Sequence, residues 1–142
     1  MIGTGHAAGT VSTSSYTWSD STTRKERWGT NKIDEYGSAT IGGYTEDYLL
    51  ASFNLSTGTT TYEAGGADHD SGGAWLVYDT LSGKWELTGI SIALTGTSGA
   101  YTGSIAIDLR DYSEWIYGVV PEPATVALLT IGGIALLRRR RR

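Results

Sequence analysis

Short apolar segments separated by glycine-rich turns limit the body of this chain to a β architecture. The sequence has 142 residues, among them 20 glycines, 9 tyrosines and 5 tryptophans. Aromatic and β-branched residues favour strands, and glycine permits the tight turns between them. We therefore predict an all-β domain of ordinary size.

The expected elements follow from apolar patterning and turn residues. The predicted strands cover residues around 11, 16–18, two segments of 24–34, 45–55, 74–78, 85–94 and 104–109. A hairpin turn is expected at 81–84, a loop at 95–103, and a short amphipathic helix at 110–117. In the strand at 45–55, we expect Tyr48 and Leu50 to face the core, with Phe53 as a further candidate.

The distribution of charge excludes one class of function. Residues 1–118 contain 14 acidic and 6 basic residues, a net charge of −8, whereas Arg138–Arg142 form a block of five arginines. Binding to nucleic acid phosphates requires a basic face, so we predict no nucleic acid partner. Cysteine is absent, which excludes disulfides and thiolate metal sites.

The segment Asp68–Trp75 (DHDSGGAW) places a serine between an aspartate and two glycines. Gly72 and Gly73 allow a tight turn that exposes the Ser71 hydroxyl. Such a turn can also direct neighbouring N–H groups to one point, as an oxyanion hole requires. The same four residues are equally typical of an ordinary loop, so this segment alone leaves both interpretations open.

Three features in order resemble the trypsin-like (chymotrypsin-fold) serine proteases. The family's nucleophile loop, Gly-Asp-Ser-Gly-Gly-Pro, is matched at residues 70–73, with His69 and Ala74 in place of a glycine and the proline. Leu87–Ser91 (LTGIS) is similar to a later strand of the family, and Tyr112–Ile116 (YSEWI) to its C-terminal helix. The resemblance implies a chymotrypsin-like six-stranded β-barrel, the second of the family's two barrels, with a short C-terminal helix.

The resemblance also implies roles for the residues of the serine loop. Ser71 would be the nucleophile that hydrolyses peptide bonds through an acyl-enzyme, with a peptide or protein as substrate. The backbone N–H groups of His69 and Ser71 would form the oxyanion hole. Asp70, Gly72 and Gly73 would support the loop.

Gly65, six residues before the serine, corresponds to the base of the family's specificity pocket. Because no carboxylate stands there, we expect no preference for arginine or lysine.

The catalytic histidine and aspartate of this family come from the first barrel, farther upstream than the 70 residues that precede Ser71. His6 and Asp47 are minor alternatives for these roles, and we expect both to be loop or strand-end residues. Residues 1–9 also contain neither the basic start nor the apolar run of a secretory signal peptide. The sequence therefore predicts an N-terminally truncated, catalytically incomplete chain.

Asp68, His69 and Asp70 are residue types that bind metals. Alternate residues on a strand point to opposite faces, however, and no second cluster completes a coordination shell. We predict neither a metal nor a cofactor.

The C-terminal segment combines three features of a sorting signal. Pro121-Glu122-Pro123 precedes 14 uncharged residues, 124–137, and then the arginine block. As a helix these 14 residues would span about 21 Å, short of a ~30 Å hydrocarbon core unless thinning and snorkelling assist. The order resembles the PEP-CTERM sorting signal of exopolysaccharide-producing Gram-negative bacteria. A plain tail anchor or a buried core helix are the alternatives.

Together these observations predict a protease-like domain at 1–118 and a sorting segment at 119–142. The sorting signal implies export, transient anchoring in the inner membrane through 124–137, processing by an exosortase-type enzyme, and release to the surface or extracellular matrix. The predicted function is a membrane- or surface-sorted serine endopeptidase. The alternative is a non-catalytic surface or matrix protein that uses the barrel as a binding module.

Overall fold

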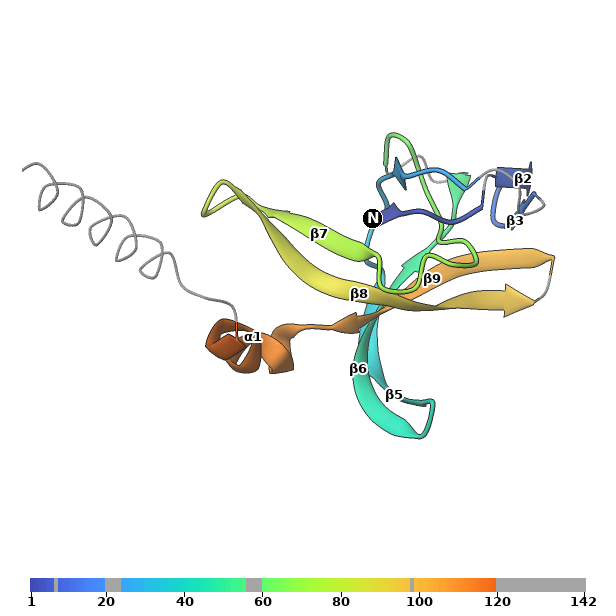
Figure 1. The fold of residues 1–142 in the computed structure, drawn as a ribbon. Coiled ribbons are helices and arrows are strands. Elements are labelled where there is room, and N and C mark those ends of the chain that lie inside the picture. Colours follow the sequence, from blue (N-terminus) through green and yellow to red (C-terminus); the bar gives the residue numbers. More distant parts are fainter. Residues whose placement is uncertain (7, 20–23, 56–59, 98, 120–142) are drawn as a thin grey trace, which may run out of the picture. The chain divides into compact units, whose positions relative to one another are not determined.

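The computed structural model describes residues 1–6, 8–19, 24–55, 60–97 and 99–119 (Figure 1). The chain divides into two compact units, residues 1–109 and 110–142. In the second unit, the 3₁₀ helix η3 (Arg110–Tyr112) leads into the helix α1 (Ser113–Val119). The short helix predicted for this part of the sequence is thus confirmed.

The first unit is built of antiparallel strands. In the described residues they are β1 (Ile2–Gly3), β2 (Ala8–Val11), β3 (Tyr16–Trp18), β4 (Arg27–Trp28), β5 (Glu35–Ile41), β6 (Tyr44–Ser52), β7 (Ala74–Asp79), β8 (Lys84–Thr97) and β9 (Ala100–Asp108). Strands β1 and β4 form a small ladder of their own, and the other seven strands belong to one sheet.

Strand β9 is the centre of the large sheet. One edge of β9 pairs with β8, which pairs in turn with β7, and Figure 1 shows β8 and β9 running side by side. The other edge pairs with β3 at Tyr101 and with β6 over residues 103–107. Within the described residues, no pairing closes this sheet into a barrel. The structure is therefore mainly β-sheet, and the chymotrypsin-like barrel stays a prediction.

A glycine pair makes the hairpin between β5 and β6. Gly42 and Gly43 have φ angles of 63° and 89°, as a two-residue hairpin turn requires, and Ile41 pairs with Tyr44 across it. Strand β5 was not predicted, because its segment EYGSATI is poor in large apolar residues. Its place in the sheet comes from its ladder with β6 rather than from its own pattern.

The tip of the β8–β9 hairpin corrects a second expectation. Residues 95–103 were predicted as a loop because threonine, serine and glycine dominate them. Residues 95–97 instead extend β8 and residues 100–103 extend β9, with Thr95 paired to Gly103 and the hydroxyls of Thr95 and Thr102 3.2 Å apart. Two glycines at positive φ, Gly96 and Gly99, provide the bend at the tip.

The core lies where β6, β7 and β9 meet. Its buried residues are Leu49, Ala51, Trp75 and Ala106, with Met1 and Ile33 packed against them. Leu49 pairs with Ala106 across the two strands. The indole N–H of Trp75 donates a 2.8 Å hydrogen bond to the hydroxyl of Ser91.

The prediction of which β6 side chains face the core was wrong for two of three residues. Leu49, Ala51 and Phe53 are buried, whereas Tyr48 and Leu50 are only partly covered. Residues 48–51 are Tyr-Leu-Leu-Ala, so both faces of the strand carry apolar side chains here. The alternation of apolar and polar residues that normally identifies the inward face is therefore missing. Only the Phe53 part of the expectation is confirmed.

The assignment of Leu49 to the core face predicts that two neighbouring substitutions lower stability by different amounts. Leu49→Ala should lower the free energy of unfolding by about 2–5 kcal/mol, because it opens a cavity against Ala106 and Trp75. Leu50→Ala, the matched control on the partly covered face, should cost about 1 kcal/mol. Urea unfolding followed by tryptophan fluorescence measures both free energies. A larger loss of stability for Leu50→Ala than for Leu49→Ala would refute the assignment of Leu49 to the core face.

Candidate functional site

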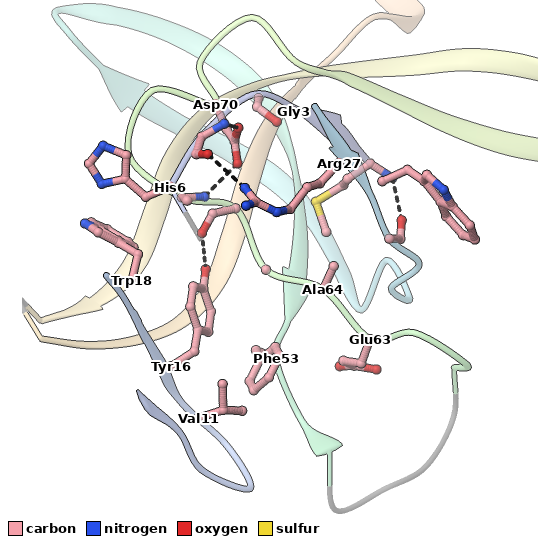
Figure 2. Close-up of a pocket in the computed structure, with 18 of the residues that line it drawn as sticks. Gly3, His6, Val11, Tyr16, Trp18, Arg27, Phe53, Glu63, Ala64 and Asp70 are labelled. Atoms are coloured by element: carbon pink, nitrogen blue, oxygen red, sulfur yellow. Dashed lines mark hydrogen bonds between the residues drawn. The ribbon is translucent and has the colours of Figure 1, made fainter. Parts of the chain in front are cut away.

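Two cavities meet at the segment 65–70. The serine pocket, of about 360 Å³, is lined by residues 66–71, by residues 91–94 of β8, and by Trp18, Tyr101 and Ser104. The N-terminal cavity, of about 280 Å³, lies among the first six residues, the β2–β3 hairpin, β4 and residues 63–67 (Figure 2). Gly66, Ala67 and Asp70 line both cavities, as do Trp18 of β3 and Ser91 of β8. We refer to the segment 66–70 as the wall between the cavities.

The serine loop is a tight turn fastened to β8. The N–H of Gly72 donates to the carbonyl of Ser91, and the N–H of Ser91 donates to the carbonyl of Gly73, both at 2.9 Å. The φ angles of His69 (72°) and Gly72 (84°) are positive, which is strained for a histidine. Ser71 lies exposed between them and lines the serine pocket. The turn predicted from the two glycines is therefore present.

The backbone N–H groups of this loop alternate in their hydrogen bonding. Those of Asp70 and Gly73 donate to carbonyls of the same loop, Ala67 and Asp70, at 3.1 and 2.9 Å. Those of His69 and Ser71 have no acceptor among the described residues. Two unpaired N–H groups thus flank Asp70 beside the serine pocket.

The Asp70 carboxylate connects the serine loop to the start of the chain. Its Oδ1 accepts a 2.6 Å hydrogen bond from the N–H of Gly5, and its Oδ2 accepts a 2.9 Å bond from that of Ala67. A Cβ at Gly3 or Gly5 would lie 2.2 or 2.7 Å from Oδ1. Figure 2 shows this contact together with the bond that Arg27 donates to the carbonyl of Gly5. Only glycines can approach the carboxylate so closely.

Gly66, in the wall between the cavities, forms hydrogen bonds with two side chains. The Tyr16 hydroxyl donates a 2.7 Å hydrogen bond to the carbonyl of Gly66, and the N–H of Gly66 donates a 2.6 Å bond to the Ser104 hydroxyl. Burial raises the pKa of Tyr16 to about 12, against the lowering effect of its interaction with Ser104. The phenol therefore stays neutral, and remains a donor, at pH values where exposed tyrosines ionise.

Gly65 lies on the other side of this wall from the serine pocket. A Cβ at Gly65 would meet the Tyr16 ring at 2.3 Å, and Gly65 lines the N-terminal cavity. Its neighbour Gly66 lines the serine pocket. The charged groups of that pocket all belong to residues 68–70, and its other walls are neutral.

The two histidines meet at the serine loop. The rings of His6 and His69 have centroids 5.2 Å apart, and Nε2 of His69 lies 3.5 Å from Oδ2 of Asp68. Neither imidazole is hydrogen-bonded to Ser71 in the described residues. The sequence carried no local signal for this meeting, because it depends on the contact between Gly5 and Asp70.

Asp47 is placed apart from this cluster. It lies exposed in β6, opposite Ser38 of β5, and it lines neither of the two cavities. The structure thus brings together Ser71, Asp70, His69 and His6, but not Asp47.

In the described part of the chain, no group of three or more histidine, aspartate or glutamate side chains is arranged to hold a metal ion. None of its helices is long and apolar enough to cross a membrane. The predicted membrane segment 124–137 and the motif residues Pro121, Glu122 and Pro123 lie outside the described residues.

The contact with Asp70 predicts that Gly5 cannot be replaced without loss. Gly5→Ala should lower the free energy of unfolding by about 1–3 kcal/mol, because its Cβ would displace the Asp70 carboxylate. Hydrogen exchange at the amides of Gly72 and Ser91 should become faster in the same variant. Thr4→Ala, an exposed neighbour, serves as control and should change stability by less than about 0.5 kcal/mol. Unchanged stability and exchange in Gly5→Ala would contradict this account.

Comparison with known proteins identifies the C-terminal segment. A family model described as the PEP-CTERM protein-sorting motif matches residues 119–142. Searches of curated proteins and of solved structures found no match. The resemblance of residues 1–118 to trypsin-like proteases stays a prediction. The sorting-signal prediction is confirmed, and the chain carries the C-terminal motif of a secreted, exosortase-processed protein of Gram-negative bacteria.

Proposed function

We propose that this surface-sorted protein is a serine endopeptidase that forms its acyl-enzyme on Ser71. The observation that carries the proposal is the position of Ser71, exposed on a tight turn at a pocket of about 360 Å³. Such a turn presents the hydroxyl to a substrate whose side chain occupies the pocket beside it.

The hydrogen-bonding pattern of the loop supports this chemistry. An acyl transfer develops negative charge on the carbonyl oxygen of the substrate, and fixed N–H donors stabilise that charge. The N–H groups of His69 and Ser71 are unpaired in the described residues, whereas the N–H of Asp70 between them donates to the carbonyl of Ala67. We assign the oxyanion hole to this pair. Asp70 then acts as a positioning residue through its bonds to Gly5 and Ala67.

An unpaired strand edge beside the pocket suits an extended peptide. The ladder between β7 and β8 ends at the pair Ala74–Ile90, and past Ser91 the described part of β8 pairs only with β9. Residues 92–94 of this edge also line the pocket. A peptide can therefore add as a strand there and place one side chain in the pocket. Because the walls of the pocket other than residues 68–70 are neutral, we expect that side chain to be apolar or aromatic rather than basic.

Activation of Ser71 requires a base that accepts its proton. His6 and His69 lie beside the loop, but neither is hydrogen-bonded to Ser71 in the described residues. The proposal therefore names no base among the described residues. The resemblance to trypsin-like proteases implies a histidine of that family's first barrel in this role.

A binding module without catalysis is the second candidate. The observation that favours it is His69, whose side chain at positive φ stands where the resembled family has glycine. The pocket and the β8 edge would bind a peptide equally well in this case. The two candidates differ in whether Ser71 reacts.

Reaction with a fluorophosphonate probe in the host organism decides between them. We expect the probe to form an adduct on Ser71 of the native protein, detected by mass spectrometry after capture, and Ser71→Ala to abolish it. Ser82→Ala, which changes an exposed serine in the β7–β8 turn, should leave labelling unchanged. Persistent labelling of Ser71→Ala would refute Ser71 as nucleophile. Absence of labelling while the protein still binds peptides would establish the binding module.

We further propose that residues 124–137 hold the protein in the inner membrane until it is processed near Pro121–Pro123. The chain should fractionate with membranes in cells that lack exosortase activity, and deletion of residues 120–142 should release it, because the uncharged segment and its arginines are then lost. Replacing all three motif residues by alanine should leave an unprocessed, membrane-bound chain. A full-length, unprocessed chain found in the soluble fraction would contradict the anchoring role.

A further inference from the structure

The helix α1 and the turn before it have an apolar stripe along one side. Tyr112, Trp115, Ile116 and Val119 follow one another at intervals of three, one and three residues, so they share one side of the helix. In this described segment, no residue of η3 or α1 is buried, and Trp115 and Val119 are 67% and 61% exposed. The stripe is therefore largely open to water.

The charged residues of the same segment stand off the stripe. Arg110, Asp111 and Glu114 occupy positions that its spacing leaves out. An apolar stripe with charges on the other sides is the pattern of helices that lie in the surface of a bilayer. Tryptophan and tyrosine are enriched at that surface, because their rings have an apolar body and a polar atom.

The short chain between α1 and the uncharged segment 124–137 brings the stripe to a membrane. Val119 is the last residue of α1, and the five residue steps from it to Ala124 reach at most about 18 Å. When 124–137 lies in the bilayer, the end of α1 is therefore held within this distance of the hydrocarbon core. The headgroup layer occupies about 5–8 Å of that distance.

The length of the uncharged segment draws α1 closer still. As a helix, the 14 residues 124–137 would fall about 9 Å short of a ~30 Å core. A segment that is too short pulls its flanking residues towards the hydrocarbon or thins the bilayer around it. Both responses move Val119 towards the lipid. A lipid surface is thus the partner that the chain itself places beside the stripe.

We propose that α1 lies in the periplasmic surface of the inner membrane while residues 124–137 anchor the chain, with its apolar stripe among the lipids and Glu114 towards water. The orientation follows from the arginine block, which stays on the cytoplasmic side. This inference rests on the anchoring proposed above and adds a second contact to it. The two contacts flank Pro121–Pro123 and hold the motif at the membrane surface.

The contact made by α1 is weak without the anchor. Binding of an interfacial helix scales with the apolar area that it buries, and this stripe has only four side chains. Processing near the motif would separate α1 from residues 124–137 and so release the helix from the lipid. Retention during anchoring and release afterwards are therefore both expected.

Quenching by brominated lipids tests the contact on the full chain. The chain is reconstituted in vesicles of phosphatidylethanolamine and phosphatidylglycerol that carry bromine on the upper part of the acyl chains. We expect part of the tryptophan fluorescence to be quenched, and Trp115→Phe to lose most of that quenching. Trp85→Phe removes a tryptophan of matched exposure, 66%, from β8 and should retain it. Equal quenching in the native chain and Trp115→Phe, or an equal loss in both variants, would overturn the proposal.

Spin labels on single cysteines separate this inference from the anchoring itself. The sequence has no cysteine, so a nitroxide on Val119→Cys, Gly118→Cys or Thr130→Cys reports one position. A Cβ at Gly118 meets nothing within 4 Å, and this position lies beside Val119 but off the stripe. We expect the labels at 119 and 130 to collide more with oxygen, which concentrates in lipid, and the label at 118 to collide more with an aqueous nickel chelate.

The label at position 130 decides which proposal fails. Lipid exposure at 130 with water exposure at both 118 and 119 would overturn the lipid contact of α1 and leave the anchoring intact. Water exposure at 130 would overturn the anchoring and, with it, the contact of α1. Equal lipid exposure at 118 and 119 would overturn the assignment of the stripe as the lipid-facing side.

Discussion

The interaction on which the site depends is the pair of hydrogen bonds to the Asp70 carboxylate. It ties the first residues of the chain, through Gly5, to the loop that presents Ser71. A carboxylate accepts such bonds strongly, and one held by two backbone N–H groups has little freedom to turn. The proximity of His6 to His69 follows from this contact, because His6 directly follows Gly5 and His69 directly precedes Asp70.

Local signals were sufficient to predict part of the fold and of the site. The strand after the serine loop, the long strand β8 and the C-terminal helix were recognised from apolar runs beside turn residues. The turn at Ser71 was predicted because two glycines follow it. The sorting motif was recognised because its three parts are contiguous in sequence and need no tertiary contact.

The rest could not be predicted, because it is decided by contacts between distant residues. The sequence of β6 is apolar on both faces, so only its ladder with β9 determines that Leu49 faces inward. His6 seemed an isolated loop residue, since nothing near it in sequence indicates contact with residue 69. The N-terminal cavity likewise has walls from six separate segments. Local patterns that repeat every two to four residues carry no information about contacts between residues far apart in the sequence.

Two adjacent glycines, Gly65 and Gly66, leave no room for side chains where the two cavities meet, and this restricts how the protein can change during evolution. A side chain at position 65 would collide with Tyr16, and one at position 66 would come within 2.9 Å of Leu94 and 3.2 Å of Ser104. Trp18 and Ser91 line both cavities as well, so a substitution at either one changes both at once. Selection can therefore reshape one cavity without the other only at residues that line that cavity alone.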